Sequence, residues 1–64
     1  MKNFIEVHSR EGALHLINVN HIVEVIGQTV YTDDTFPDAT DYSRTVCTET
    51  YEEIKTLIER AVEQ

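Results

Sequence analysis

The chain has 64 residues, with twelve acidic and five basic side chains, a formal net charge of −7 and a pI near 4.6. A chain of this length forms one domain, residues 1–64, and buries only about 60% of the surface that it exposes when unfolded, so its margin of stability is thin. The acidic balance opposes binding to nucleic acid and to anionic lipid, and a single cysteine excludes an intramolecular disulfide.

The N-terminal part of the chain predicts a β-hairpin. Residues 4–9 (FIEVHS) and 13–17 (ALHLI) alternate in the two-residue period that is typical of strands. Between them, residues 10–12 (REG) form a turn, in which Gly12 can adopt a positive φ without steric cost.

A polar interruption at residues 18–21 (NVNH) precedes the apolar segment 22–26 (IVEVI). One strand running through both would span some 14 residues, beyond the usual 3 to 10. Asn is favoured at turns because its side chain can bond the backbone two residues further on. We therefore predict a bend or a single helical turn at 18–21, with Val19 and Ile22 tucked back under the sheet.

Three more strands complete the expected sheet. Residues 22–26 are the third strand, and a tight Gly-Gln turn leads to residues 29–32 (TVYT), whose β-branched and aromatic side chains favour a fourth. Residues 33–41 (DDTFPDATD) predict a polar loop. Residues 42–48 (YSRTVCT) predict a fifth strand that pairs with the fourth.

The C-terminal segment 51–64 predicts an amphipathic helix. Thr50 followed by Glu53 fits the capping box S/T-x-x-E. Apolar residues recur at helical spacing and form one stripe: Ile54, Leu57, Ile58, Ala61 and Val62. We therefore expect an α+β fold, a small antiparallel β-sheet of four to five strands in the order β-β-β-β-β-α, with the C-terminal helix packed on one face.

Apolar side chains occur on both faces of the expected strands. A sheet that is covered by a helix on one face should be polar on the other, and contiguous exposed apolar area usually marks an interface. We therefore predict a non-enzymatic interaction protein, a homo-oligomer that self-associates through its sheet, with an unknown protein as a further partner. The predicted interface residues are Phe4, Ile17, Ile22 and Ile26. Alternatively, the sheet curls on itself and buries both sets of side chains.

The histidines and the acidic loop are the candidate metal ligands of the sequence. A zinc site would place His8 and His15 as cross-strand neighbours on the face away from Leu14 and Leu16, where the two imidazoles and a carboxylate such as Glu6 can hold the metal. With His21 included, the spacing matches neither HExxH nor CxxC, and residues 33–41 lack the EF-hand order of aspartates. We expect no metal and no cofactor, and a solvated acidic loop that a basic partner can contact.

Catalytic motifs are absent from the sequence. There is no GxSxG, P-loop or GxGxxG, and Cys47 has no neighbour in sequence that would activate its thiol, so we expect a structural cysteine and no enzyme. The sequence has neither the apolar core of a signal peptide nor the roughly 18 apolar residues of a membrane span, so a cytoplasmic protein is expected. The alternative function is a small regulatory nucleic-acid-binding module, which would need Lys2, Arg10 and Arg44 gathered on one surface.

A family resemblance is carried by the order FIEV, a turn, LIN, HIVEVI, a β-rich segment and TVCTETYEEIKTLIERA. This order resembles that of the small flagellar FlbD family, also called the swarming-motility SwrD proteins, over residues 4–17, 18–26 and 46–61. The resemblance implies a non-enzymatic accessory of the bacterial flagellar motor. The chain departs from the family at residues 10–12, where the family has Leu-Asn-Gly, and at residues 33–41, where it has a tight Asn-Gly turn.

Overall fold

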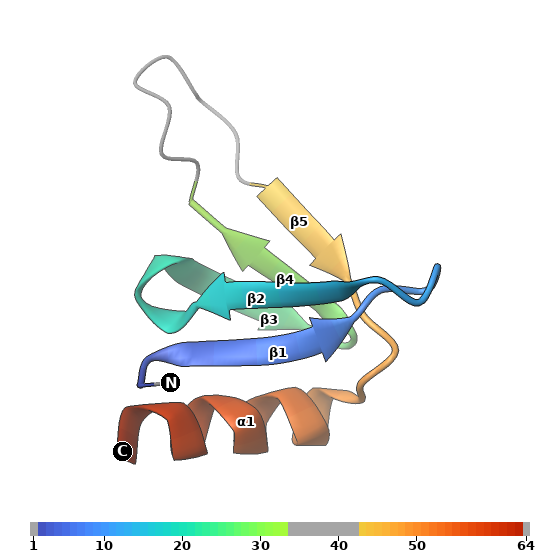
Figure 1. Cartoon of the computed structure of the whole chain (residues 1–64). Coiled ribbons are helices and arrows are strands. Elements are labelled where there is room, and N and C mark those ends of the chain that lie inside the picture. Colours follow the sequence, from blue (N-terminus) through green and yellow to red (C-terminus); the bar gives the residue numbers. More distant parts are fainter. Residues whose placement is uncertain (1, 34–42, 64) are drawn as a thin grey trace.

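The structure is a computed structural model that describes residues 2–33 and 43–63. These residues form two antiparallel sheets and a C-terminal helix (Figure 1). The elements in chain order are β1 (Phe4–His8), β2 (Leu14–Asn18), the 3-10 helix η1 (Val19–His21), β3 (Ile22–Ile26), β4 (Thr29–Thr32), β5 (Ser43–Val46) and α1 (Tyr51–Glu63). The α+β class is confirmed. The expected single sheet is wrong, because the strands divide into β1–β2 and β3–β4–β5.

The chain leaves the first sheet through η1. The side chain of Asn18 accepts a hydrogen bond from the Asn20 N–H at 2.9 Å and caps this short helix. The predicted bend is therefore confirmed, and Val19 and Ile22 pack against the core as expected. A single antiparallel bridge between Ser9 and Cys47 joins the end of β1 to the chain just beyond β5.

The core lies between the two sheets, and α1 runs along β1 (Figure 1). The register places Ile5 opposite Ile17 in the hairpin and Val25 opposite Val30 in the second sheet, and residues that lie opposite each other share a face. The buried apolar residues are Ile5, Val7, Ile17, Val30, Cys47, Ile54 and Ala61. Burying an Ile or Val side chain contributes about 1.5–3 kcal/mol to stability. The packing of these core residues therefore holds the two sheets and α1 together.

The turns and the strand ends follow local signals in the sequence. The predicted bounds of the third and fourth strands are confirmed, and the other strand bounds differ from the structure by up to two residues. Gly12 and Gly27 have φ angles of 89° and 56°, in the left-handed region that favours glycine. Most of the predicted loop at 33–41 lies outside the described residues.

The predicted capping box starts α1. The Thr50 Oγ1 accepts from the Glu53 N–H at 3.2 Å, and the Glu53 Oε1 accepts from the Thr50 N–H at 3.1 Å. Of the predicted apolar stripe, Ile54 and Ala61 are buried. Leu57 and Ile58 pack against the core in partly buried positions, whereas Val62 at the C-terminal end of the stripe is 52% exposed.

Asn3 joins three elements, and no local signal in the sequence indicates this role. Its φ of 65° is left-handed, which Asn tolerates better than most other residues. Its N–H donates to the Ala61 carbonyl at 3.1 Å, and its carbonyl accepts from the Val19 N–H at 2.8 Å. The start of β1 is thereby tied to η1 and to the last turn of α1.

Candidate functional site

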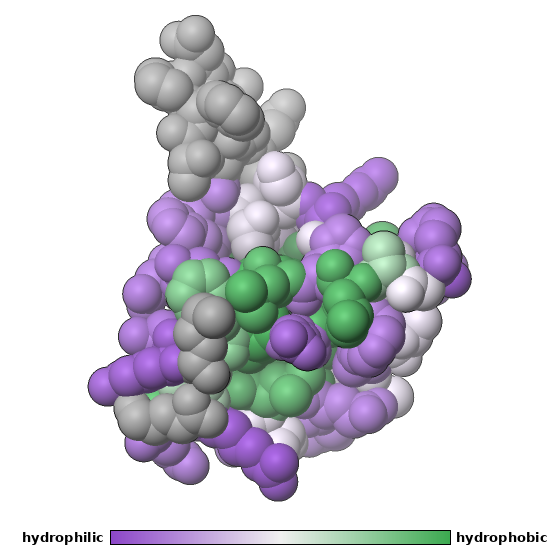
Figure 2. All heavy atoms as spheres, viewed as in Figure 1, coloured by the Kyte–Doolittle hydropathy of each residue, from purple (hydrophilic) through white to green (hydrophobic). Residues whose placement is uncertain are grey.

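The outer face of the β1–β2 hairpin carries solvent-exposed apolar side chains. Leu14 lies opposite His8, and Leu16 lies opposite Glu6, so these side chains share the face turned away from the core. Leu14 is 63% and Leu16 is 53% exposed, and half-buried Phe4 belongs to the same face. Figure 2 shows apolar atoms gathered over the front of the molecule, bordered by hydrophilic ones. Phe4, Leu14 and Leu16 are called the hairpin patch below.

His8 and His15 lie on opposite faces of the hairpin, so the expectation that they are cross-strand neighbours was wrong. His15 pairs with Val7, whose side chain is buried in the core. The register brings Val7 inward and therefore turns the leucines of β2 outward. In the described part of the chain, no group of three or more His, Cys, Asp or Glu side chains could hold a metal ion.

The four predicted interface residues do not form one surface. Ile17 is a core residue, 8% exposed, and half-buried Ile22 packs against the core. Phe4 belongs to the hairpin patch. Ile26 is 55% exposed on the outer face of the second sheet, where it shares a cross-strand row with Val46. Ile26 and Val46 are called the second patch.

An acidic groove of about 430 Å³ borders the hairpin patch. Its lining residues come from β1, the residues before α1, and the first turns of α1: Glu6, Glu49, Glu52, Glu53, Thr56 and Leu57. Glu6 belongs both to this groove and to the outer face of the hairpin. The hairpin patch is therefore rimmed by carboxylates on the side of the helix.

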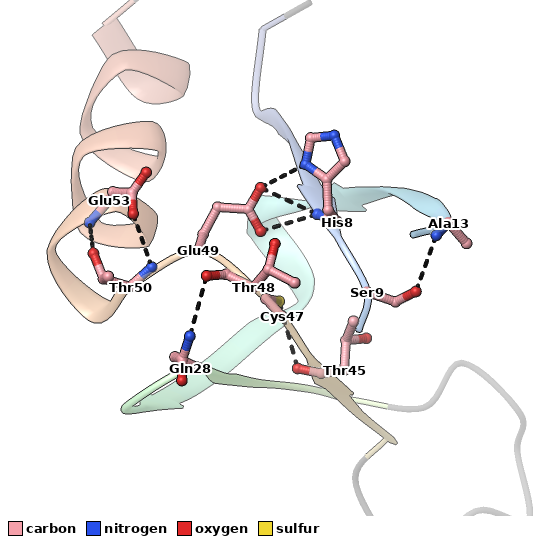
Figure 3. Close-up of polar contacts among 10 residues, drawn as sticks. All are labelled: His8, Ser9, Ala13, Gln28, Thr45, Cys47, Thr48, Glu49, Thr50 and Glu53. Carbon is pink, nitrogen blue, oxygen red and sulfur yellow. Dashed lines mark hydrogen bonds and ion pairs between the residues drawn. The ribbon is translucent and has the colours of Figure 1, made fainter. Parts of the chain in front are cut away.

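Glu49 completes the hydrogen bonding of β1 at the point where the second sheet ends (Figure 3). Its carboxylate accepts from the His8 N–H at 2.9 and 3.2 Å, and its Oε2 lies 2.7 Å from the His8 Nδ1. The neighbouring Thr48 N–H donates to the His8 carbonyl at 2.8 Å. Burial acts to raise the pKa of Glu49, but the hydrogen bonds from the His8 ring and N–H outweigh it and hold this pKa below its ordinary value.

A second groove, of about 400 Å³, lies between the turn after β1 and β5. It is lined by Arg10 and Glu11 from the turn, by His15 from β2, and by Arg44 and its two successors in β5. It is called the basic groove. An adjoining groove of about 300 Å³ shares His15 with it and continues along β2 toward the His21–Asp33 pair, whose Nδ1 and Oδ1 atoms are 2.9 Å apart.

Cys47 is fully buried beneath these surfaces. Its Sγ lies 3.6 Å from the Thr45 carbonyl oxygen. Burial raises the pKa of the Cys47 thiol, and the negative charge of Glu49 raises it further. A thiol in this state is protonated at neutral pH and unreactive, which fits the structural role expected from the sequence.

Among the described residues, no helix combines the length and the apolar composition that crossing a membrane requires. Comparisons of the chain with models of known families, with curated proteins and with solved structures found no match. The resemblance to the FlbD family therefore stays a prediction.

Proposed function

We propose that this chain is a non-enzymatic interaction protein that self-associates through its β-sheets, with the hairpin patch as the contact surface. The observation that carries the proposal is the exposure of Leu14 and Leu16, side by side on the outer face of β2. Large apolar side chains in contiguous exposed positions are unusual on a monomer and are typical of an interface.

A contact between two identical hairpin patches is consistent with the geometry of the sheet. Two sheets can pack face to face at about 10 Å, and a two-fold axis then brings the same residues of both copies together. Covering Leu14 and Leu16 would remove about half of each side chain from water, which corresponds to about 1–2 kcal/mol per leucine. A 64-residue domain gains from such burial, because its own core is small.

The decisive experiment is light scattering coupled to size exclusion, at several protein concentrations. The wild-type protein is expected to exceed the monomer mass of 7.4 kDa, and the variant Leu14→Lys/Leu16→Lys is expected to return to it, because lysines at the contact would bury unpaired charge. Both positions are exposed, so the substitutions leave the core intact. A variant at Ile17 would not be informative, since that residue is buried.

Two control variants locate the contact. Ile26→Lys/Val46→Lys tests the second patch, and Val62→Lys tests an equally exposed apolar position on the helix. Both controls should keep the wild-type mass. A monomeric wild-type protein, or a mass that only the second-patch variant lowers, would refute the proposed contact.

The salt dependence gives an independent measurement. Each copy carries a formal charge of −7, so two copies repel each other at low ionic strength. Salt screens this repulsion while leaving apolar contacts in place. We therefore expect the dissociation constant to fall as salt rises from about 10 mM to about 150 mM, a range over which the Debye length shortens roughly fourfold. Association that weakens with salt would indicate a contact between opposite charges instead.

The alternative, a nucleic-acid-binding module, has partial support from the gathering of Arg10 and Arg44 in the basic groove. Lys2 is not part of this gathering, because it precedes the start of β1 whereas Arg10 follows its end. The net charge also opposes a polyanion. A filter-binding assay without salt-dependent retention of DNA or RNA would remove this alternative. The motility role implied by the FlbD resemblance stays a prediction.

A further inference from the structure

The basic groove gathers cationic groups in a chain that is otherwise strongly acidic. The chain has three arginines, and two of them line this groove: Arg10 from the hairpin turn and Arg44 from β5. Among the described residues, the close contacts between a basic side chain and a carboxylate are His8 with Glu49 and His21 with Asp33, and neither arginine takes part in them.

The three cationic or donor groups suit a phosphate. A guanidinium offers paired N–H donors that match the oxygens of a phosphate group, and the His15 imidazole adds a third donor from β2. Glu11 also lines the groove and opposes an anion there. The site is therefore expected to bind an anion with moderate strength, and this opposing carboxylate provides a way to test it.

The size of the groove and the charge of the chain favour a small molecule over a long polyanion as the ligand. About 400 Å³ lies within the range of small-molecule sites, which is roughly 300–1,000 Å³. A polyanion would extend past the groove onto a molecule with a net charge of −7 and would be repelled along its length. The adjoining groove, which shares His15 and ends at Asn18 and the His21–Asp33 pair, offers polar groups to the uncharged part of a ligand.

We propose that the basic groove binds the phosphate group of a small phosphorylated molecule, held by Arg10 and Arg44 with His15 beside them. The site is separate from the proposed self-association surface. His15 is directed to the opposite side of β2 from Leu14 and Leu16, and neither leucine lines the basic groove, so Arg10 and Arg44 can be altered without changing the hairpin patch. Leu16 does line the adjoining groove, so its substitution is kept for the test of self-association.

The test is a titration of ¹⁵N-labelled full-length protein with inorganic pyrophosphate, followed by NMR. Saturable shifts confined to residues 9–15 and 44–46 would support the proposal. Arg10→Gln and Arg44→Gln should each weaken binding roughly five- to tenfold, the effect of losing one charge-assisted hydrogen bond at a partly exposed site. Glu11→Gln should strengthen it, and Arg60→Gln on the helix should change it less than about twofold, since isolated surface charges act weakly across a screened distance.

Three outcomes would overturn the proposal. The first is the absence of saturable binding by wild-type protein that gives a folded spectrum. The second is a set of shifts outside the groove, or binding that Arg10→Gln and Arg44→Gln leave unchanged. The third is binding of a single-stranded oligonucleotide, with a steep salt dependence, by protein that does not bind pyrophosphate, which would favour nucleic acid as the ligand. Self-association is measured separately by light scattering, so failure of one proposal does not imply failure of the other.

Discussion

Replacing Glu49 with Gln should lower the free energy of unfolding at neutral pH, because a carboxylate side chain here takes the place of a neighbouring strand. The His8 N–H points away from β2, and it is bonded by Glu49 at 2.9 Å rather than by a backbone carbonyl. Gln keeps the shape and one acceptor oxygen but removes the charge. Hydrogen bonds to charged groups contribute about 1.5–3 kcal/mol and neutral ones about 0.5–1.5, so the loss at this bond is about 1 kcal/mol.

The contact with the His8 ring adds at most a similar amount. The ring is 55% exposed, and pairs that are this open to solvent contribute about 0.2–1 kcal/mol. The Glu49 carboxylate is only 13% exposed, so the contribution of the ring contact is expected in the upper half of this range of about 0.2–1 kcal/mol. The total expected loss is therefore about 1–2 kcal/mol, or a fall in Tm of roughly 5–15 °C for a domain of this size.

The pH dependence identifies the charge of Glu49 as the cause. Its pKa is lowered in the folded protein, so its ionised form stabilises the fold fully above the ordinary value of 4.5, and this stabilisation is lost as the pH falls through the folded pKa. The Gln variant has no such step. The difference in stability between wild type and variant should therefore be largest at pH 7 and should shrink toward zero in acid.

The assay is urea unfolding followed by circular dichroism at several pH values. The same substitution in a His8→Ala background separates the two contributions, because His8→Ala removes the ring but keeps the N–H. A difference of about 1 kcal/mol should survive in that background, since the backbone bond remains. A difference that is equal at pH 7 and pH 3, or that disappears entirely with the ring, would refute the role given to the backbone bond.

Three further predictions concern the core, a turn and the thiol. Ile54→Ala should cost about 2–5 kcal/mol in urea unfolding because the side chain is fully buried, whereas the exposed Val62→Ala should cost less than about 0.5. Gly27→Ala should cost about 1–2 kcal/mol because a φ of 56° is left-handed, and Gly27→Asn should cost less, as Tm shifts will show. Cys47 should react with a thiol reagent only as fast as the protein unfolds, so labelling should accelerate sharply in urea; rapid labelling of native protein would contradict its burial.

The parts of the fold that the sequence predicted are those with local causes. The bend at Asn18 and the start of α1 at Thr50 depend on side chains that bond backbone groups two or three residues away. The positive φ at Gly12 depends on the missing Cβ alone. Signals of this kind are complete within a few residues, so they can be read before any tertiary contact is known.

The division into two sheets could not be predicted in the same way. The first three strands have apolar residues on both faces, so their pattern does not say which face is buried, and a shift of one residue exchanges the two faces. Leu14 and Leu16 are exposed because Ile5 pairs with Ile17 and the second sheet covers the face of the hairpin that carries these two isoleucines. The leucines lie on the other face. Glu49 and His8 are 41 positions apart, and nothing near either residue in the sequence indicates their contact.

The net charge of a protein predicts whether it repels a long charged polymer, but it does not predict the charge of an individual groove on its surface. The same chain, at −7, has an acidic groove beside α1 and a basic groove beside β5, because the fold brings Arg10 from the first hairpin to Arg44 in the second sheet. The overall charge acts on a long polyanion along its whole length, whereas a single phosphate in the groove is held mainly by the groups within hydrogen-bonding reach. An acidic composition therefore argues against nucleic acid as a ligand but not against a small phosphorylated molecule. Arg10→Gln and Arg44→Gln test directly whether the groove binds such a molecule.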